Sequence, residues 1–452
     1  MMKLKFHHLI YLLILSLPFY GYPLINLQVR AIRWDWAILL LMIGLVTLQV
    51  LTAHGFRVYR SKIFVWLGIT NIFLLMSSFN PIMSGDYSNI IDFASSWVLY
   101  VLNSVVFVIV CCLKVNSDIL RKVIKLYLWT ALGVCVYGLI QFAGMNLFGW
   151  DLYLNFTSVK YEASKSGYAF LLGDVKRATS VFVEPRHFGV YMIVPFFISL
   201  LHLVKWDHGI RLFRKGFNRL IVLLFGIGIL VSLSLAAFLG FGIALLVFPF
   251  ISRVSLHRVL PSFMFIVIAG VTSLALVEII WNIGVMEYVG TRLLPSRYEL
   301  NHLLDYEIHL GGPPRYVRGA ILAFEYLIQH PMTGIGLNQY ESIVPYDVIA
   351  LPPFNLMASI GVFGFSSFVC FMYLLVRSID SLRRRACPTS SFLLDTALIM
   401  VLLTLVNSLF AARYNYPSTM FWFGMSIGGM ILFNVRRWER EQQEGHHEAS
   451  PS

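Results

Sequence analysis

Residues 235–252 read LAAFLGFGIALLVFPFIS, eighteen consecutive residues without a charged side chain. A run of this length can cross the hydrocarbon core of a bilayer as an α-helix. Because lipid offers no water to the backbone, such a segment must satisfy its own hydrogen bonds as a helix. Similar runs recur along the 452 residues, of which 58% are hydrophobic and 13% charged, with a mean hydropathy of +0.74. The sequence therefore predicts an all-α, polytopic membrane protein.

The apolar runs predict about twelve transmembrane helices. Their approximate ranges are 7–25, 34–53, 61–79, 90–113, 122–147, 180–204, 217–234, 235–252, 259–282, 353–376, 390–411 and 415–435. With both termini in the cytoplasm, the cytoplasmic segments hold 23 of the 35 Lys and Arg residues, as the positive-inside rule requires. Lys3 and Lys5 precede the first run and no small-residue cleavage site follows it, so we expect this helix to be retained.

The spans and loops divide the chain into six parts. These are N-terminal spans (1–147), an external loop (148–179), central spans (180–282), a large external loop (283–352), C-terminal spans (353–435) and a cytoplasmic tail (436–452). The tail is expected to fray after Arg440. A loop of about seventy residues is usually functional or disordered, and its helical pattern predicts a folded periplasmic subdomain. None of the five cysteines falls in an expected external loop, so no disulfide framework is predicted.

Residues 311–338 form the polar part of the large loop. Pro313, Pro314 and Pro331 suit the start and the end of a helix. Its apolar positions recur at helical spacing and share one face, namely Val317, Ile321, Phe324 and Ile328. Arg315, Arg318 and Glu325 fall on another face. The apolar face is expected to pack on the spans while the guanidiniums meet an anion; an ordinary solvated surface helix is the alternative.

Residues 176–189 form another polar segment, the first of the two in chain order, which leads into the sixth span. Pro185 suits the first turn of that helix, with Glu184 before it and Arg186 and His187 after it. A helix N-terminus favours a carboxylate and disfavours cations, unless an anion is bound there as well. The segment therefore predicts an anion site, and a simple ion pair between Glu184 and Arg186 is the alternative.

Four short motifs occur in order on the same side of the predicted membrane. They are Arg177…Phe182-x-Glu184-Pro185, Ser232-Leu-Ser234, Arg315…His330-Pro331-x-x-Gly334-x-Gly336 and Asn355…Gly361-x-x-Gly364. Together they resemble the O-antigen polymerase and O-antigen ligase superfamily over roughly residues 170–375. The resemblance implies a polyprenyl-diphosphate-dependent glycosyltransferase in the bacterial inner membrane, with its active site on the periplasmic side.

The resemblance also implies the partners. Donor and acceptor would be undecaprenyl-diphosphate-linked oligosaccharides in the bilayer, with a flippase and a chain-length regulator as further partners. No cofactor, metal or nucleic acid is implied. Ligase-type members usually carry a His where this chain has Phe354, and a Ser-Arg-Gly pattern where it has Leu235-Ala-Ala. A polymerase of O-antigen or exopolysaccharide is therefore favoured over a lipopolysaccharide ligase. A transporter of lipid-linked sugars is the third reading, although no repeated halves are visible.

The chemistry of such a transfer assigns roles to individual residues. A diphosphate leaving group needs preorganised cations, and guanidinium geometry matches phosphate oxygens. The candidates for this role are Arg177, Arg186, Arg315 and Arg318. An acceptor hydroxyl needs a base or a positioning group; Glu184, His187 or His330 could serve, and Glu184 is the first choice. His330 is more strongly expected to cap a helix, and Gly334 and Gly336 are expected to permit a tight turn or the close approach of a sugar. With Asn355, these three residues form the expected substrate loop. Asp305 and Glu307 resemble a metal pair only faintly, since no further acidic ligand lies beside them.

Overall fold

The computed structural model is helical, with two short β-hairpins. It describes residues 6–19, 22–26, 31–51, 58–83, 87–150, 152–154, 171–172, 175–182, 184–206, 211–253, 315–337, 339–340, 352–410 and 418–448, and the single residues 264, 272 and 275. The predicted span 259–282, apart from those single residues, and most of the large loop lie outside this set. Asp305 and Glu307, which resemble a metal pair only faintly, lie outside it as well.

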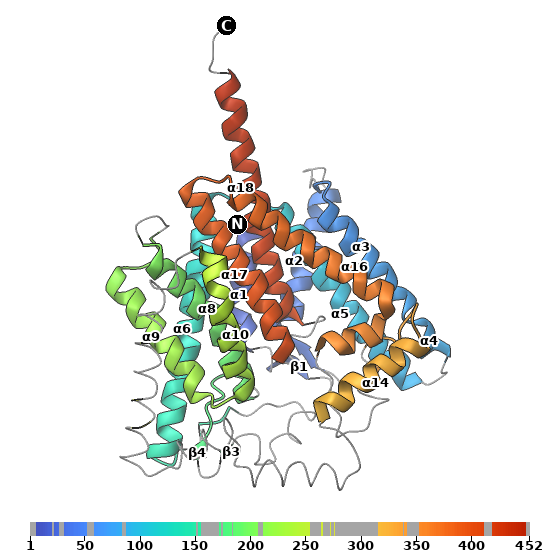
Figure 1. Cartoon of the computed structure of the whole chain (residues 1–452), viewed down its shortest axis with the longest axis horizontal. Coiled ribbons are helices and arrows are strands. Elements are labelled where there is room, and N and C mark those ends of the chain that lie inside the picture. The colour runs from blue at the N-terminus through green and yellow to red at the C-terminus, as the bar shows by residue number, and fades with distance from the viewer. Residues whose placement is uncertain are drawn as a thin grey trace.

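Helices follow one another along nearly the whole described chain (Figure 1). The N-terminal half holds α1 (Phe6–Ser16), η1 (Leu17–Phe19), α2 (Trp34–Leu51), α3 (Lys62–Met76), α4 (Phe79–Met83), α5 (Tyr87–Cys112) and α6 (Ser117–Leu147). The rest holds α8 (Pro185–Val204), α9 (Lys215–Val231), α10 (Leu235–Ser252), α14 (Arg315–Gln329), α16 (Pro352–Arg383), α17 (Pro388–Phe410) and α18 (Thr419–Glu448). The hairpins are β1 (Pro23–Asn26) with β2 (Ala31–Arg33), and β3 (Leu171–Leu172) with β4 (Val175–Lys176).

Six described segments are long and apolar enough to cross a membrane. They are Lys62–Met83, Asn89–Cys112, Ser117–Leu147, Pro185–Val204, Pro352–Arg383 and Pro388–Leu409. The all-α, membrane-compatible fold is thus confirmed, and the figure of twelve spans stays a prediction. The expectation of a frayed tail was wrong, because α18 continues as a helix through it to Glu448, as the upper end of Figure 1 shows.

Polar side chains mark where several helices begin. Ser61 accepts a hydrogen bond from the Ile63 N–H at the start of α3, and Asn116 accepts one from the Ile119 N–H at the start of α6. Each satisfies a backbone donor that the first turn of a helix leaves open. These short polar residues therefore help to set where the two helices begin.

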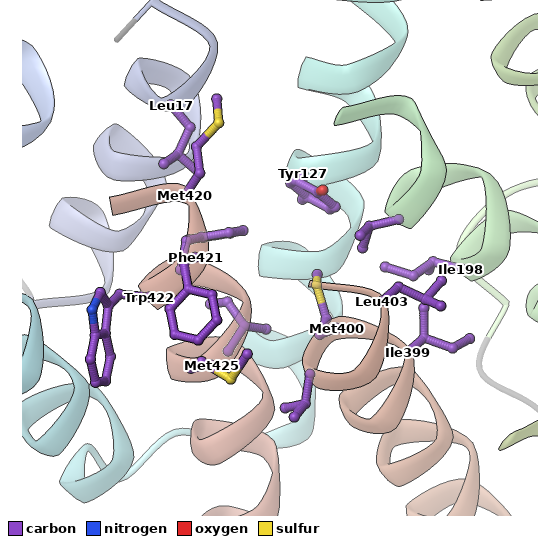
Figure 2. Close-up of a cluster of buried hydrophobic side chains, with 14 of the residues drawn as sticks. Leu17, Tyr127, Ile198, Ile399, Met400, Leu403, Met420, Phe421, Trp422 and Met425 are labelled. Atoms are coloured by element: carbon purple, nitrogen blue, oxygen red, sulfur yellow. The ribbon is translucent and has the colours of Figure 1, made fainter. Parts of the chain in front are cut away.

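Helix α8 lies at the centre of the bundle. Nearly all of its residues are buried, and it packs against α6, α9, α10 and α17. The core beside it is filled by large apolar side chains from five parts of the chain (Figure 2). Those labelled there are Leu17, Tyr127, Ile198, Ile399, Met400, Leu403, Met420, Phe421, Trp422 and Met425. Dense packing on every side fixes the position of α8, and with it the polar residues at its N-terminus.

Candidate functional site

The first polar segment forms the N-terminus of α8. Glu184 is the residue before the helix, with extended backbone, and Pro185 occupies the first turn as predicted. The Glu184 carboxylate lies 2.5 Å from Nε of Arg186, and their side chains are 27% and 40% exposed. The simple ion pair that the sequence allowed is therefore formed. Both members still reach the surface, so the pair can meet a ligand.

The chain before α8 is fixed by two amides of α6. Gln141 is fully buried, and its Oε1 accepts hydrogen bonds from the backbone N–H groups of Thr179 and Ser180 at 2.8 and 2.7 Å. Asn146 binds the N–H and the carbonyl of Lys176, both at 2.8 Å. Two side chains of a membrane-compatible helix thus replace a β-sheet partner for an irregular segment, as buried backbone groups require.

Ser180 shows how firmly this segment is held. Its φ of +52° lies in the left-handed region, which is uncommon for a residue with a side chain. Its hydroxyl donates to the Val134 carbonyl at 2.6 Å, and its N–H donates to Gln141. Such a conformation persists when its surroundings impose it, so the loop is preorganised.

Arg177 is anchored against the turn between α9 and α10. Its Nε donates to the carbonyl of Ser232 at 3.3 Å, and the neighbouring Ala178 N–H donates to the Val231 carbonyl. The same turn lies against α8, because a Cβ added to Gly189 would be 2.3 Å from the Ser232 hydroxyl. Arg177 and the Glu184–Arg186 pair are therefore brought to the first turns of one helix. Ser232, the first residue of the Ser232-Leu-Ser234 motif, contacts both Arg177 and α8.

His187 has a different environment from its neighbours. Its side chain is only 1% exposed and lies within the packed part of α8. A sugar-bearing substrate cannot reach a side chain buried to this extent. Of the two candidate catalytic residues in this segment, only Glu184 is accessible.

The second polar segment, around α14, forms a tight turn against α16. Gly334 and Gly336 have φ of +66° and +103°, as the expectation of a tight turn requires. The Ile335 and Gly336 N–H groups donate to the carbonyls of Ala358 and Ser359, each at 3.0 Å. A Cβ at Gly334 would lie 2.3 Å from the Ser359 oxygen. The glycines therefore serve close approach to another backbone.

The partner of this turn is a break in α16. Gly361 has φ of +71° inside the helix, and the N–H of Val362 donates to the Pro331 carbonyl at 2.9 Å. The broken helix thus exposes backbone carbonyls that the 330–337 segment binds. Non-helical backbone is tolerated at membrane depth where other protein covers it in this way.

Three further contacts hold the second segment. Asn80 of α4 donates from Nδ2 to the Gly334 carbonyl, and Gln339 donates to the Asn89 carbonyl at 2.9 Å. Tyr340 is buried and donates to the Gly319 carbonyl of α14 at 2.7 Å. Burial, and secondarily the charge of a nearby Tyr326 phenolate, raises the pKa of Tyr340 to about 12, so its phenol stays protonated at neutral pH.

The face of α14 that packs on α16 differs from the prediction. The α14 residues that pack there or against Tyr340 are Leu322, Ala323 and Tyr326, and Phe354 of α16 joins the same cluster. Ile321, Phe324 and Ile328 are exposed instead, with Ile328 77% exposed. The prediction that this stripe packs on the spans was wrong for Ile321 and Ile328, whereas the ring of Phe324 lies 5.8 Å from that of Phe354 in α16. The side chain of Val317 lies outside the described part of the chain.

The remaining candidates lie in or beside α14 and α16. Arg315 and Arg318 are in the first turn of α14, and their side chains lie outside the described part of the chain. His330 follows α14, where its N–H donates to the Tyr326 carbonyl and its own carbonyl accepts from Gly334. Asn355, at the start of α16, accepts from the Ser359 hydroxyl at 3.1 Å. The contacts of His330 are made by its backbone, and the capping role expected for its side chain stays a prediction.

The two polar segments lie towards one end of the molecule. In Figure 1, α14 and the hairpin of β3 and β4 are both at the end opposite the C-terminus. Helices α8 and α14 begin at Pro185 and Arg315, far apart in sequence, yet the packing of α8 and α16 brings the two segments to this end. Among the described residues, no cluster of three or more His, Cys, Asp or Glu side chains is arranged to hold a metal.

The residues that build the site are partly different from those that the motifs indicated. Gln141, Asn146 and Asn80 position the two segments but belong to no motif. Each is an amide side chain within an otherwise apolar run. That signal was available in the sequence, because polar side chains inside spans usually face a partner in the protein interior.

A comparison of the chain with known protein families found no match, and a comparison with curated proteins found no significantly similar sequence.

Proposed function

We propose that this chain is a polysaccharide polymerase of the bacterial inner membrane. It would transfer a glycan from undecaprenyl diphosphate to the terminal sugar of a second lipid-linked repeat unit at the outer face. The observation that carries the proposal is the first turn of α8, where Arg177, Glu184 and Arg186 gather on a preorganised loop. The motif resemblance supports it independently of the geometry.

The proposed reaction is a single substitution at the anomeric carbon of the donor. The acceptor hydroxyl oxygen forms the new glycosidic bond, and the bond to the diphosphate oxygen breaks. The hydroxyl proton passes to the Glu184 carboxylate, and undecaprenyl diphosphate leaves with the electron pair. Arg177 and Arg186 stabilise the negative charge that develops on it, together with Arg315 and Arg318 of α14.

The ion pair between Glu184 and Arg186 fits this scheme. In the free protein each ion neutralises the other at the surface, which avoids a bare cation at a helix N-terminus. An arriving diphosphate competes with the carboxylate for Arg186. Glu184 is then released to face the acceptor.

A charge swap distinguishes chemistry from simple pairing. Glu184→Gln should abolish polymer at normal protein abundance, and the double variant Glu184→Arg with Arg186→Glu should restore the pair but no polymer. If the double variant makes polymer, the two residues serve only as an ion pair and the proposal fails at this site. His330→Asn is the matched control at the other segment and should keep its polymer, with at most about 1 kcal/mol of lost stability.

A further inference from the structure

We infer that α14 is an in-plane membrane helix whose exposed apolar edge, defined by Ile321, Phe324 and Ile328, lies in the outer leaflet of the bilayer. The inference concerns the surface of this helix and holds whatever reaction the chain catalyses. It follows from which sides of α14 are covered, from what the uncovered side carries, and from the surface that adjoins it.

The covered side of α14 is already satisfied by protein. Ala323 is buried against α16, and Tyr326 and Leu322 pack with Tyr340. Ile321 and Ile328 lie away from this contact and are 44% and 77% exposed. Phe324 is 47% exposed and borders the contact, because its ring lies 5.8 Å from that of Phe354 in α16. The apolar edge is therefore a second apolar side of α14, in addition to the side that Ala323 buries against α16.

The uncovered side of α14 carries apolar side chains on one flank and polar side chains on the other. Glu325 and Gln329 are exposed next to Phe324 and Ile328, respectively. At 100° per residue, Glu325 and Gln329 lie beside the apolar edge, on the flank that we expect to face water. One apolar and one polar flank on the same exposed side is the pattern of a helix lying in a bilayer surface.

The apolar edge continues into surface that belongs to membrane-compatible helices. Met332, just after α14, is exposed beside Pro331, whose carbonyl binds the N–H of Val362 in α16. Phe363 is exposed and stacks on Phe73 of α3 at 6.1 Å. Helix α4, which contacts the Gly334 turn, exposes three more large apolar side chains: Phe79, Ile82 and Met83.

This continuity selects lipid as the occupant. The exposed side chains of α3 and α16 meet hydrocarbon when these helices span a bilayer, and the apolar edge of α14 is followed by the exposed Met332 next to the contact with α16. A helix at this level rests in the interfacial layer with its apolar side a few ångströms below the headgroups. A lipid-linked substrate would carry its diphosphate at that same depth.

The test uses the purified full chain in nanodiscs of phosphatidylethanolamine and phosphatidylglycerol, in a background without native cysteines. Ile328→Cys and its neighbour Gln329→Cys each receive a fluorophore that reports polarity. The Ile328 label should emit at shorter wavelength, be quenched by lipids that carry a nitroxide near the headgroup end of the chain, and resist aqueous iodide. The Gln329 label should show the opposite pattern.

Each alternative outcome overturns the inference. Iodide quenching at both positions would place the edge in water, and lipid quenching at both would bury the whole exposed side. Protection of Ile328 from both quenchers would mean that protein covers it. Phe324→Cys and Glu325→Cys repeat the comparison one turn earlier and keep the test decisive if one label perturbs the fold.

Discussion

Gln141 is the residue on which the shape of the α8 site depends most directly. Gln141→Met keeps the length of the side chain and removes the Oε1 acceptor. The backbone N–H groups of Thr179 and Ser180 are then left unpaired in a buried place. A buried polar group without a partner costs about 1–3 kcal/mol, so two cost about 2–6 kcal/mol.

The same change should loosen the site. The Gln141 amide helps to hold Ser180 at a positive φ. If Ser180 relaxes, Arg177, which precedes it by three residues, would change its position. We therefore expect the free energy of unfolding to fall by about 2–6 kcal/mol and polymer to decrease even at temperatures where the protein stays folded. Unfolding is measured by titration with sodium dodecyl sulfate in mixed micelles, followed by tryptophan fluorescence.

The matched control is Tyr137→Phe. The Tyr137 hydroxyl donates to the Leu152 carbonyl, which Gln141 also binds through Nε2, so the carbonyl keeps one donor. Its loss should cost about 0.5–1.5 kcal/mol, the net value of one hydrogen bond. If Gln141→Met is no more destabilising than Tyr137→Phe, the amide does not hold the loop and the reasoning is refuted.

Three further predictions concern the diphosphate site, the opposite end of α8 and the orientation. Arg315→Ala and Arg318→Ala should each lower the polymerisation rate about 10²–10³-fold, while the corresponding Lys variants should keep part of the rate. Normal polymer from both Ala variants would mean that these residues are ordinary surface charges. Asp395→Asn should lower the free energy of unfolding by about 3–5 kcal/mol in the same titration, because Asp395 is fully buried and pairs with Lys205 at 2.5 Å and with Arg383 at 2.9 Å. A decrease below about 1 kcal/mol would mean that water already solvates these ions. With the cysteine-free background, Gln329→Cys should react with an impermeant thiol reagent in spheroplasts and Ser381→Cys only after lysis, and the reverse would invert the topology.

Some features of this protein were determined by the sequence alone. A run such as 235–252 has no folded alternative to a helix in lipid, because its backbone must bond internally. The start of the helix at Pro185 was also determined locally, because proline restricts the backbone there. These elements depend on residues that are near neighbours in the chain.

Other features were decided by tertiary structure. The sequence placed Ile321, Phe324 and Ile328 on one face of α14, but periodicity cannot say whether protein or lipid covers an apolar face. The accessible Glu184 and the buried His187 are three residues apart, and only the packing of α8 separates them. The amides of Gln141 and Asn80 reach partners 38 and 254 residues away. Such contacts depend on how the helices pack, because side chains distant in sequence meet only after each helix has found its neighbours.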